Sequence, residues 1–163
     1  MGYEHEWLCQ RIVEDAPEAI IFADRDGVIR FWNAGAQHLF GYKPEEAQGQ
    51  TLDLIVPERL RERHWKGYHR VMATGVSRYG RDQLLAVPAV GRDGGRISVE
   101  FSIVLLRDAA DQPLGVAAVM RDVSKRWEEQ RRLRERLAAL ETAARSAARG
   151  TEAMPAASPP DPA

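Results

Sequence analysis

A hydrophobic strand that runs directly into a charged helix is the feature that most constrains this chain. Residues 114–121 are apolar enough for a strand inside a packed domain, and they end in Arg121-Asp-Val-Ser124. Charged residues follow from Lys125 onward, with no glycine or proline between the two segments to form a loop. The pattern indicates a packed domain joined without a loop to a helix that contacts something outside it.

A second strand shows the period of a sheet with one buried face. Ile97, Val99, Phe101, Ile103 and Leu105 alternate with polar residues. Further elements are predicted from apolar runs, caps and turns: strands at 19–23, 28–32 and about 85–89, a turn or strap at 51–55, and helices at 34–40, from Pro44, and at about 57–73. Strands on both sides of a helical insert predict an α+β fold.

The chain length of 163 residues suffices for one domain with a proper core. We expect a flanking helix at 1–14, a globular domain at 15–124, a signalling and dimerisation helix at 125–149 and a disordered tail at 150–163. The tail is rich in proline and alanine, a composition that does not build a core.

The predicted C-terminal helix carries a short heptad seam. Steps of four and three residues separate its apolar positions, which are Leu133, Leu137, Leu140, Ala144 and Ala147. The same seam meets Arg126 and Gln130 upstream, so it is weak near the domain. The spacing predicts a coiled-coil-like helix, and with it a homodimer whose pairing also needs a surface of the globular domain or the N-terminal helix.

Composition excludes several classes of protein. The formal net charge is −1, so no global field favours nucleic acid or an anionic membrane. Cys9 is the only cysteine, which excludes an internal disulfide and a cysteine metal cluster. No apolar run reaches the roughly 18 residues of a membrane span, and the N-terminus lacks a signal-peptide pattern. We expect a cytoplasmic protein with no membrane contact.

Five motifs in order carry a family resemblance. They are Asp24-Arg-Asp-Gly27, Phe31-Trp-Asn33, Leu39-Phe-Gly-Tyr42 with Pro44-Glu-Glu, Arg92-Asp-Gly94, and Arg121-Asp-Val-Ser124. Over residues 6–125 the chain resembles a PAS domain of the sensory-box type. The resemblance implies a five-stranded antiparallel sheet with a helical layer that clasps a pocket. It also implies signalling through flanking helices, commonly as a dimer.

His64 is the leading candidate for a cofactor ligand. It lies on the apolar side of the longest internal helix, and a neutral imidazole is a good ligand for haem iron. The spacing from Pro57 to His64 resembles that of the proximal histidine in haem-binding PAS sensors of the rhizobial oxygen-sensor kinase kind. This partial resemblance implies haem b, with the candidate pocket lined by Tyr68, Leu85, Phe101 and Ile103. The alternative is a histidine that packs or hydrogen-bonds at the helix–sheet edge.

The chain departs from those haem sensors at two positions. Gly67 stands where they often have a tyrosine, and Tyr68 follows it. Leu85 falls where they have the distal arginine that steadies bound oxygen, so an apolar distal wall would favour carbon monoxide or a second protein ligand. Residues 33–42 contain no cysteine, which excludes the covalent flavin chemistry of light-sensing relatives and leaves a redox flavin open.

No catalytic arrangement is recognised. The serines have no readable histidine and acid partners, and residues 91–95 form a hairpin turn between strands, not a phosphate-binding loop. Arginines on the C-terminal helix interleave with glutamates, so intrahelical pairs such as Glu128–Arg132 explain them better than nucleic-acid binding. The sequence predicts a non-enzymatic protein.

Three functional hypotheses remain open at this point. The first is a sensory module, responsive to a ligand or a partner, that transmits through its C-terminal helix to a separate signalling protein. The second is a haem-dependent gas or redox sensor with His64 as axial ligand. The third is a ligand-free structural or adaptor module whose pocket is filled by Phe101, Ile103 and Met120.

Overall fold

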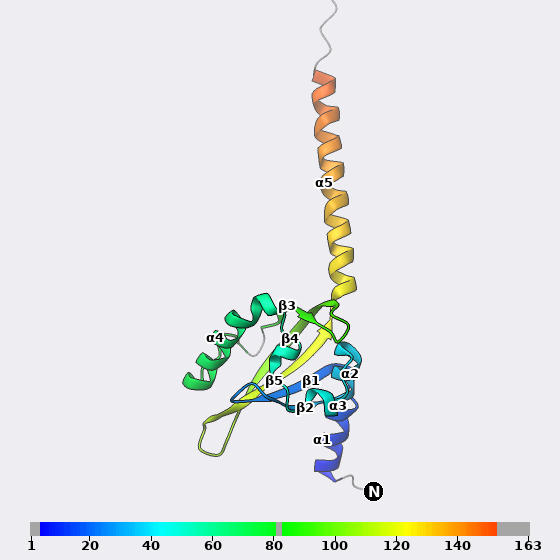
Figure 1. Cartoon of the computed structure of the whole chain (residues 1–163). Coiled ribbons are helices and arrows are strands. Elements are labelled where there is room, and N and C mark those ends of the chain that lie inside the picture. The colour runs from blue at the N-terminus through cyan, green and yellow to red at the C-terminus, as the bar shows by residue number, and fades with distance from the viewer. Residues whose placement is uncertain (1–3, 81–82, 153–163) are drawn as a thin grey trace, which may run out of the picture. The chain divides into compact units, whose positions relative to one another are not determined.

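The protein is described by a computed structural model that covers residues 4–80 and 83–152. The chain divides into two compact units, one up to Ser124 and one from Lys125 onward. The first unit is α+β, as predicted, and contains one sheet and several helices (Figure 1). Of the helices within the described residues, none combines the length and the apolar character that a membrane span requires.

Five antiparallel strands form a single sheet in the order β2-β1-β5-β4-β3, which confirms the expected architecture. Pro88 lies in β3 at one edge of the sheet, where a residue without a backbone N–H costs no ladder bond. The strand bounds are β1 (Ala19–Asp24), β2 (Ile29–Trp32), β3 (Leu85–Val90), β4 (Arg96–Arg107) and β5 (Pro113–Asp122).

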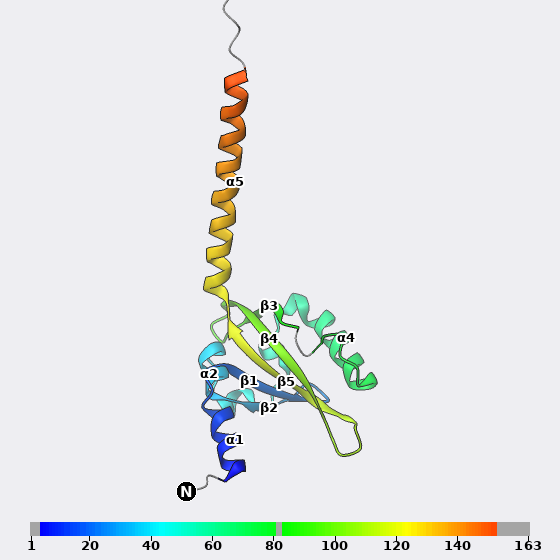
Figure 2. The same ribbon diagram turned by 180° about the vertical axis from the view of Figure 1, so that it is seen from behind.

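Short helices fill the connection between β2 and β3. The helices of the first unit are α1 (His5–Glu14), α2 (Ala34–Phe40), α3 (Pro44–Ala47), the 3₁₀ turn η1 (Leu52–Leu54) and α4 (Glu58–Thr74). Asn33 caps α2, and Gly41 ends it with a left-handed φ of 80°, as the sequence predicts. α2 lies beside β1 and α4 lies toward β5, at opposite ends of the helical layer (Figures 1 and 2).

The core lies on the sheet face that meets the helices. The register aligns Leu85 with Phe101 and Phe101 with Met120, and it aligns Ile103 with Ala118. The odd-numbered residues of the alternating strand therefore share one face, as predicted. Core side chains form two clusters. The first contains Phe40, Ile21 and Met120, and the second contains Ala23, Tyr68 and Met72.

The second unit consists of one long helix. α5 (Ser124–Glu152) begins at the predicted junction and continues from the expected end at residue 149 to Glu152. The remainder of the predicted disordered tail, residues 153–163, lies outside the described residues. The three leucines of the heptad seam, Leu133, Leu137 and Leu140, are exposed on α5.

Candidate functional site

His64 lies half-buried on α4 in an aromatic environment. Its ring centroid is 5.2 Å from that of Trp65 and 5.8 Å from that of Tyr68. The Nδ1 atom is buried and has no hydrogen-bond partner in the described part of the chain. Burial lowers the pKa of His64, Asp53 acts in the opposite direction, and His69 lowers it further. The imidazole is therefore held in its neutral form, which is the form that binds a metal.

Tyr68 anchors α4 to the first strand of the sheet. Its hydroxyl lies 3.0 Å from the carbonyl oxygen of Ala23 and 2.5 Å from that of Asp24. Burial raises the pKa of the Tyr68 hydroxyl, so it remains a hydrogen-bond donor at neutral pH. This predicted pocket residue thus has a structural role, since its hydroxyl joins α4 to β1.

The other three predicted pocket residues lie on the inner face of the sheet. Leu85 pairs with Phe101 across β3 and β4, and all three side chains are only partly buried. Phe101 and Ile103 pack against the first core cluster, whereas the ring neighbours of His64 belong to the second. The sheet therefore presents an apolar wall of partly buried side chains, and two of them pack against a different core cluster from the ring neighbours of His64.

Trp65 fixes α4 to the strap before it, a role that the sequence did not reveal. The indole Nε1–H donates to Asp53 Oδ1 at 2.8 Å, and the ring of His69 stacks on the indole at 5.6 Å with an interplanar angle of 25°. A hydrogen bond between the two side chains could be suspected from neither spacing nor composition, because 12 residues separate them. It orients the helix that carries His64.

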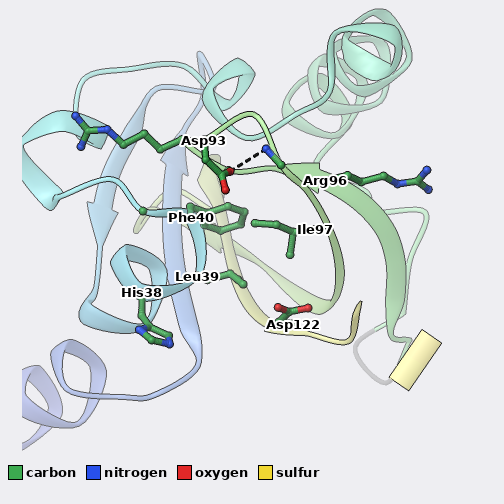
Figure 3. A pocket seen from close by; sticks show the side chains of 11 residues that line it. His38, Leu39, Phe40, Asp93, Arg96, Ile97 and Asp122 are labelled. Carbon is green, nitrogen blue, oxygen red and sulfur yellow. Dashed lines mark hydrogen bonds between the residues drawn. The ribbon is translucent and has the colours of Figure 1, made fainter. Parts of the chain in front are cut away.

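A cavity of about 690 Å³ lies between the end of α2 and the start of β4, lined by no residue of α4. Leu39, Phe40 and Ile97 form its apolar part, with Asp122 beside them, while the side chain of Arg96 extends away from it (Figure 3). A smaller neighbouring cavity of about 280 Å³ also includes Asp122. None of the five candidate cofactor-site residues lines either cavity, whereas Met120, which was expected to fill the pocket, lines the smaller one. Sequence periodicity gave no sign of either cavity.

The junction between β5 and α5, residues 122–124, is tied to β4 by two hydrogen bonds, and a third lies within the junction. Asp122 Oδ1 accepts from the Ser124 N–H at 2.8 Å, and the Ser124 hydroxyl accepts from the Ser98 N–H at 3.0 Å. The Val123 N–H donates to the Ser98 carbonyl at 2.8 Å, and the Val123 side chain is buried. The first residue of α5 is therefore held by the sheet.

His64 is the one candidate ligand for a haem iron among the residues singled out from the sequence. Among the described residues, no group of three or more histidine, cysteine or acidic side chains is arranged to hold a metal ion. His64 provides a neutral imidazole with an orphaned buried nitrogen, and Leu85, Phe101 and Ile103 provide partly buried apolar surface on the sheet. These features suit a planar apolar cofactor with one axial protein ligand.

Known proteins are similar to this chain along most of its length. It is 28% identical over 127 residues to the sensor protein FixL of Bradyrhizobium diazoefficiens, and the alignment covers 76% of this chain but 24% of FixL. It is 27% identical over 124 residues to the oxygen sensor protein DosP of Escherichia coli, covering 76% of this chain and 15% of DosP. The chain thus spans at most about a quarter of the length of these relatives.

Solved structures and a family model agree on the fold. The crystal structure of a PAS domain from Colwellia psychrerythraea superposes with a TM-score of 0.65 at 20% identity, covering 75% of this chain and 99% of that one. The model of the PAS fold family matches residues 13–128, which include all five strands and the start of α5. The chain therefore belongs to the PAS fold family.

Proposed function

We propose that this protein is a sensory PAS module that responds to a ligand or a partner on the inner face of its sheet and transmits the response through α5. The relatives named above are sensor proteins, which supports a sensory role. In this proposal α5 contacts another protein, which is either a second copy of the chain or a separate signalling protein. The chain itself catalyses no reaction.

The observation that carries the proposal is the hydrogen-bonded junction. Phe101 on the candidate wall pairs with Met120 on β5, and Met120 lies two residues before Asp122. Asp122 in turn bonds to the first residue of α5. A displacement of the wall therefore reaches α5 through β5 without crossing a flexible loop, because regular strand geometry extends to the junction.

Hydrogen exchange in the full chain tests this coupling without any ligand. Phe101→Ala removes inner-face packing, and we expect faster exchange at residues 125–128 of α5 than in the wild type. Val104→Ala is the matched control, since Val104 lies on the same strand but is 47% exposed. The proposal fails if both variants leave the first turn of α5 unchanged while Phe101→Ala loosens β4.

A haem-dependent sensor is the second candidate function, and the orphaned Nδ1 of neutral His64 favours it. Haem would supply an iron that binds a diatomic gas or changes redox state. His64 would hold the iron, and Leu85, Phe101 and Ile103 would line the cofactor. Because Leu85 offers no hydrogen bond, the site would favour carbon monoxide or a second protein ligand over stable oxygen binding.

Absorption spectroscopy decides the haem candidate. The protein is mixed with haemin, and a Soret band is expected that is lost in His64→Ala and retained in His69→Ala, since His69 is exposed on the same helix. The absence of a band, or an unchanged band in His64→Ala, excludes His64 as the axial ligand. The sensory proposal survives either result, because the exchange experiment does not involve haem.

A ligand-free structural or adaptor module is the third candidate. Met120 is 8% exposed, and Phe101 and Ile103 pack against the same core cluster, so the protein's own side chains occupy much of the inner face. In that case neither haemin nor flavin mononucleotide raises the melting temperature, and Phe101→Ala lowers stability without altering exchange in α5. A thermal shift with either probe would exclude this candidate.

A further inference from the structure

The cavity of about 690 Å³ at the end of α2 has an apolar part that is open to a ligand. It consists of Phe40 of the first core cluster and of Leu39 and Ile97, which pack against that cluster (Figure 3). Leu39 and Ile97 are only partly buried, so some of their apolar surface remains accessible. A space of this size accommodates a small organic molecule. None of the five candidate cofactor-site residues lines it, so this cavity is separate from the candidate haem site.

Two carboxylates frame the apolar part of the cavity. In the view of Figure 3 the side chains of Asp93 and Asp122 lie on either side of it. Each accepts one backbone hydrogen bond, Asp93 Oδ1 from the Gly95 N–H and Asp122 Oδ1 from the Ser124 N–H, both at 2.8 Å. Neither forms an ion pair within the part of the chain that the structure describes. Their negative charges are therefore available to a ligand.

The basic side chains of the lining do not neutralise these carboxylates. Arg92 Nη1 donates to Glu46 Oε2 at 2.8 Å, which occupies this guanidinium outside the cavity. The side chains of Arg96 and His38 point away from the apolar part in Figure 3. A molecule that lies on the apolar part therefore meets negative charge at its ends.

The glycine-rich turn at residues 91–95 offers few donors to an anion. The N–H groups of Arg92, Gly94 and Gly95 already donate to oxygens of the protein, at 2.9, 3.0 and 2.8 Å. A phosphate or carboxylate ligand needs such donors, and here it would also be repelled by the two carboxylates of the lining. The cavity therefore favours a cation with apolar surface.

We propose that this cavity binds a short aliphatic diamine. Its methylene chain would lie on the apolar part, and its two ammonium groups would pair with Asp93 and Asp122. The ligand then presents an apolar segment between two positive charges, which matches an apolar lining between two negative charges. Because Asp122 also bonds to Ser124, the bound diamine would stabilise the start of α5. Only this effect on α5 rests on the proposed function.

Isothermal titration calorimetry with the full chain and 1,5-diaminopentane tests the class of ligand. Both carboxylates are exposed, so an ion pair with either one should improve affinity by at most about fivefold. We expect 1-aminopentane to bind up to about fivefold more weakly than the diamine, and 1,5-pentanediol and glutarate not to bind. In a series of shorter and longer diamines one length should bind best, because the two carboxylates are fixed. Equal affinities for 1-aminopentane and every diamine overturn the proposal, as does the absence of binding.

Asp93→Asn and Asp122→Asn test the position of the site. The amide oxygen of asparagine can still accept the backbone bond, so each variant removes a charge and keeps its turn or junction. Each should bind the diamine no more tightly than the wild type binds 1-aminopentane. Asp26→Asn, which removes an exposed carboxylate that lines neither cavity, should bind like the wild type. Unchanged affinity in both cavity variants overturns the proposed site.

Two further measurements separate this site from the function proposed above. His64→Gln should bind the diamine like the wild type, and a loss of binding in the folded variant would move the ligand to the candidate haem site and overturn the proposal. Saturation with the diamine should slow hydrogen exchange at the Ser124 N–H. Binding without slower exchange supports the site and overturns its effect on α5.

Discussion

The Ser124 hydroxyl accepts a hydrogen bond from the backbone N–H of Ser98 at 3.0 Å, although the two residues lie 26 positions apart. This contact joins the start of α5 to β4, a strand that also carries two of the candidate wall residues. The Val123 N–H returns a bond to the carbonyl of the same Ser98 at 2.8 Å. The first residue of α5 is therefore bonded to the sheet.

Ser124→Ala removes the acceptor and leaves the partly buried Ser98 N–H without its partner. We expect a loss of about 1 kcal/mol in the free energy of unfolding, typical of a single hydrogen bond removed from a partly buried donor. Urea denaturation followed by circular dichroism measures it. Thr142→Ala, which removes an exposed hydroxyl in the middle of α5, should be close to neutral. Equal stabilities for the two variants would show that the junction bond contributes nothing.

Asn33 is the most connected buried polar residue of the described core, and its loss should be severe. Its Oδ1 accepts from the N–H groups of Ile20 and Ala36 at 2.8 and 2.9 Å, and its Nδ2 donates to the carbonyls of Val13 and Glu18 at 3.0 Å. Asn33→Ala leaves several buried groups unpaired, so we expect about 3 kcal/mol of destabilisation in urea denaturation. Gln37→Ala, an exposed change on the same helix, is the control, and a similar loss there would contradict this account.

Most of the fold was predictable because its signals are local. Alternation over 97–105 predicted the buried face of β4, and Asn33 and Gly41 predicted the ends of α2. The network around Asn33 was predictable only as a helix cap. Its bonds to Ile20, Val13 and Glu18 depend on how α1, β1 and α2 come together, and no spacing in the sequence encodes that.

The sequence predicted which residues belong to the candidate site, but not the hydrogen bonds that those residues make. His64 was identified from its position on the apolar side of α4, and the structure adds the orphaned Nδ1 that makes it chemically distinct. Tyr68 was expected in the pocket wall, whereas its hydroxyl bonds to the backbone of β1. The Trp65–Asp53 bond and the cavity beside Asp122 arise from segments distant in sequence, which periodicity does not detect.

Two glycines in helices should respond in opposite directions to substitution by alanine. A Cβ on Gly35 would lie 2.2 Å from the carbonyl oxygen of Glu18, whereas a Cβ on Gly67 would have nothing within 4 Å. We expect Gly35→Ala to lose at least about 2 kcal/mol through displacement of backbone. Gly67→Ala should gain about 0.5–1 kcal/mol, since alanine favours a helix interior. Thermal denaturation of both variants checks this, and destabilisation by Gly67→Ala would reveal a contact at that position.

The buried histidine predicts how stability depends on pH in the haem-free protein. Because burial lowers the pKa of His64 below its ordinary value of 6.5, the unfolded chain takes up a proton at a pH where the folded chain does not. The contribution of His64 to the free energy of unfolding is therefore complete above pH 6.5. The free energy of unfolding decreases as the pH drops below that value. Urea midpoints measured at about pH 7.5 and about pH 5.5 should differ more for the wild type than for His64→Gln.

His69→Gln is the matched control for this pH dependence. His69 is exposed on the same helix and stacks on Trp65. His69→Gln therefore removes a neighbouring imidazole but leaves the buried imidazole of His64 in place. The carboxylate of Asp53, which accepts the bond from the Trp65 indole, favours the charged imidazole of His64, so Asp53→Asn should steepen the decline in stability at low pH. If His64→Gln shows the same pH dependence as the wild type, His64 takes up its proton as readily in the folded protein as in the unfolded chain, and burial does not lower its pKa.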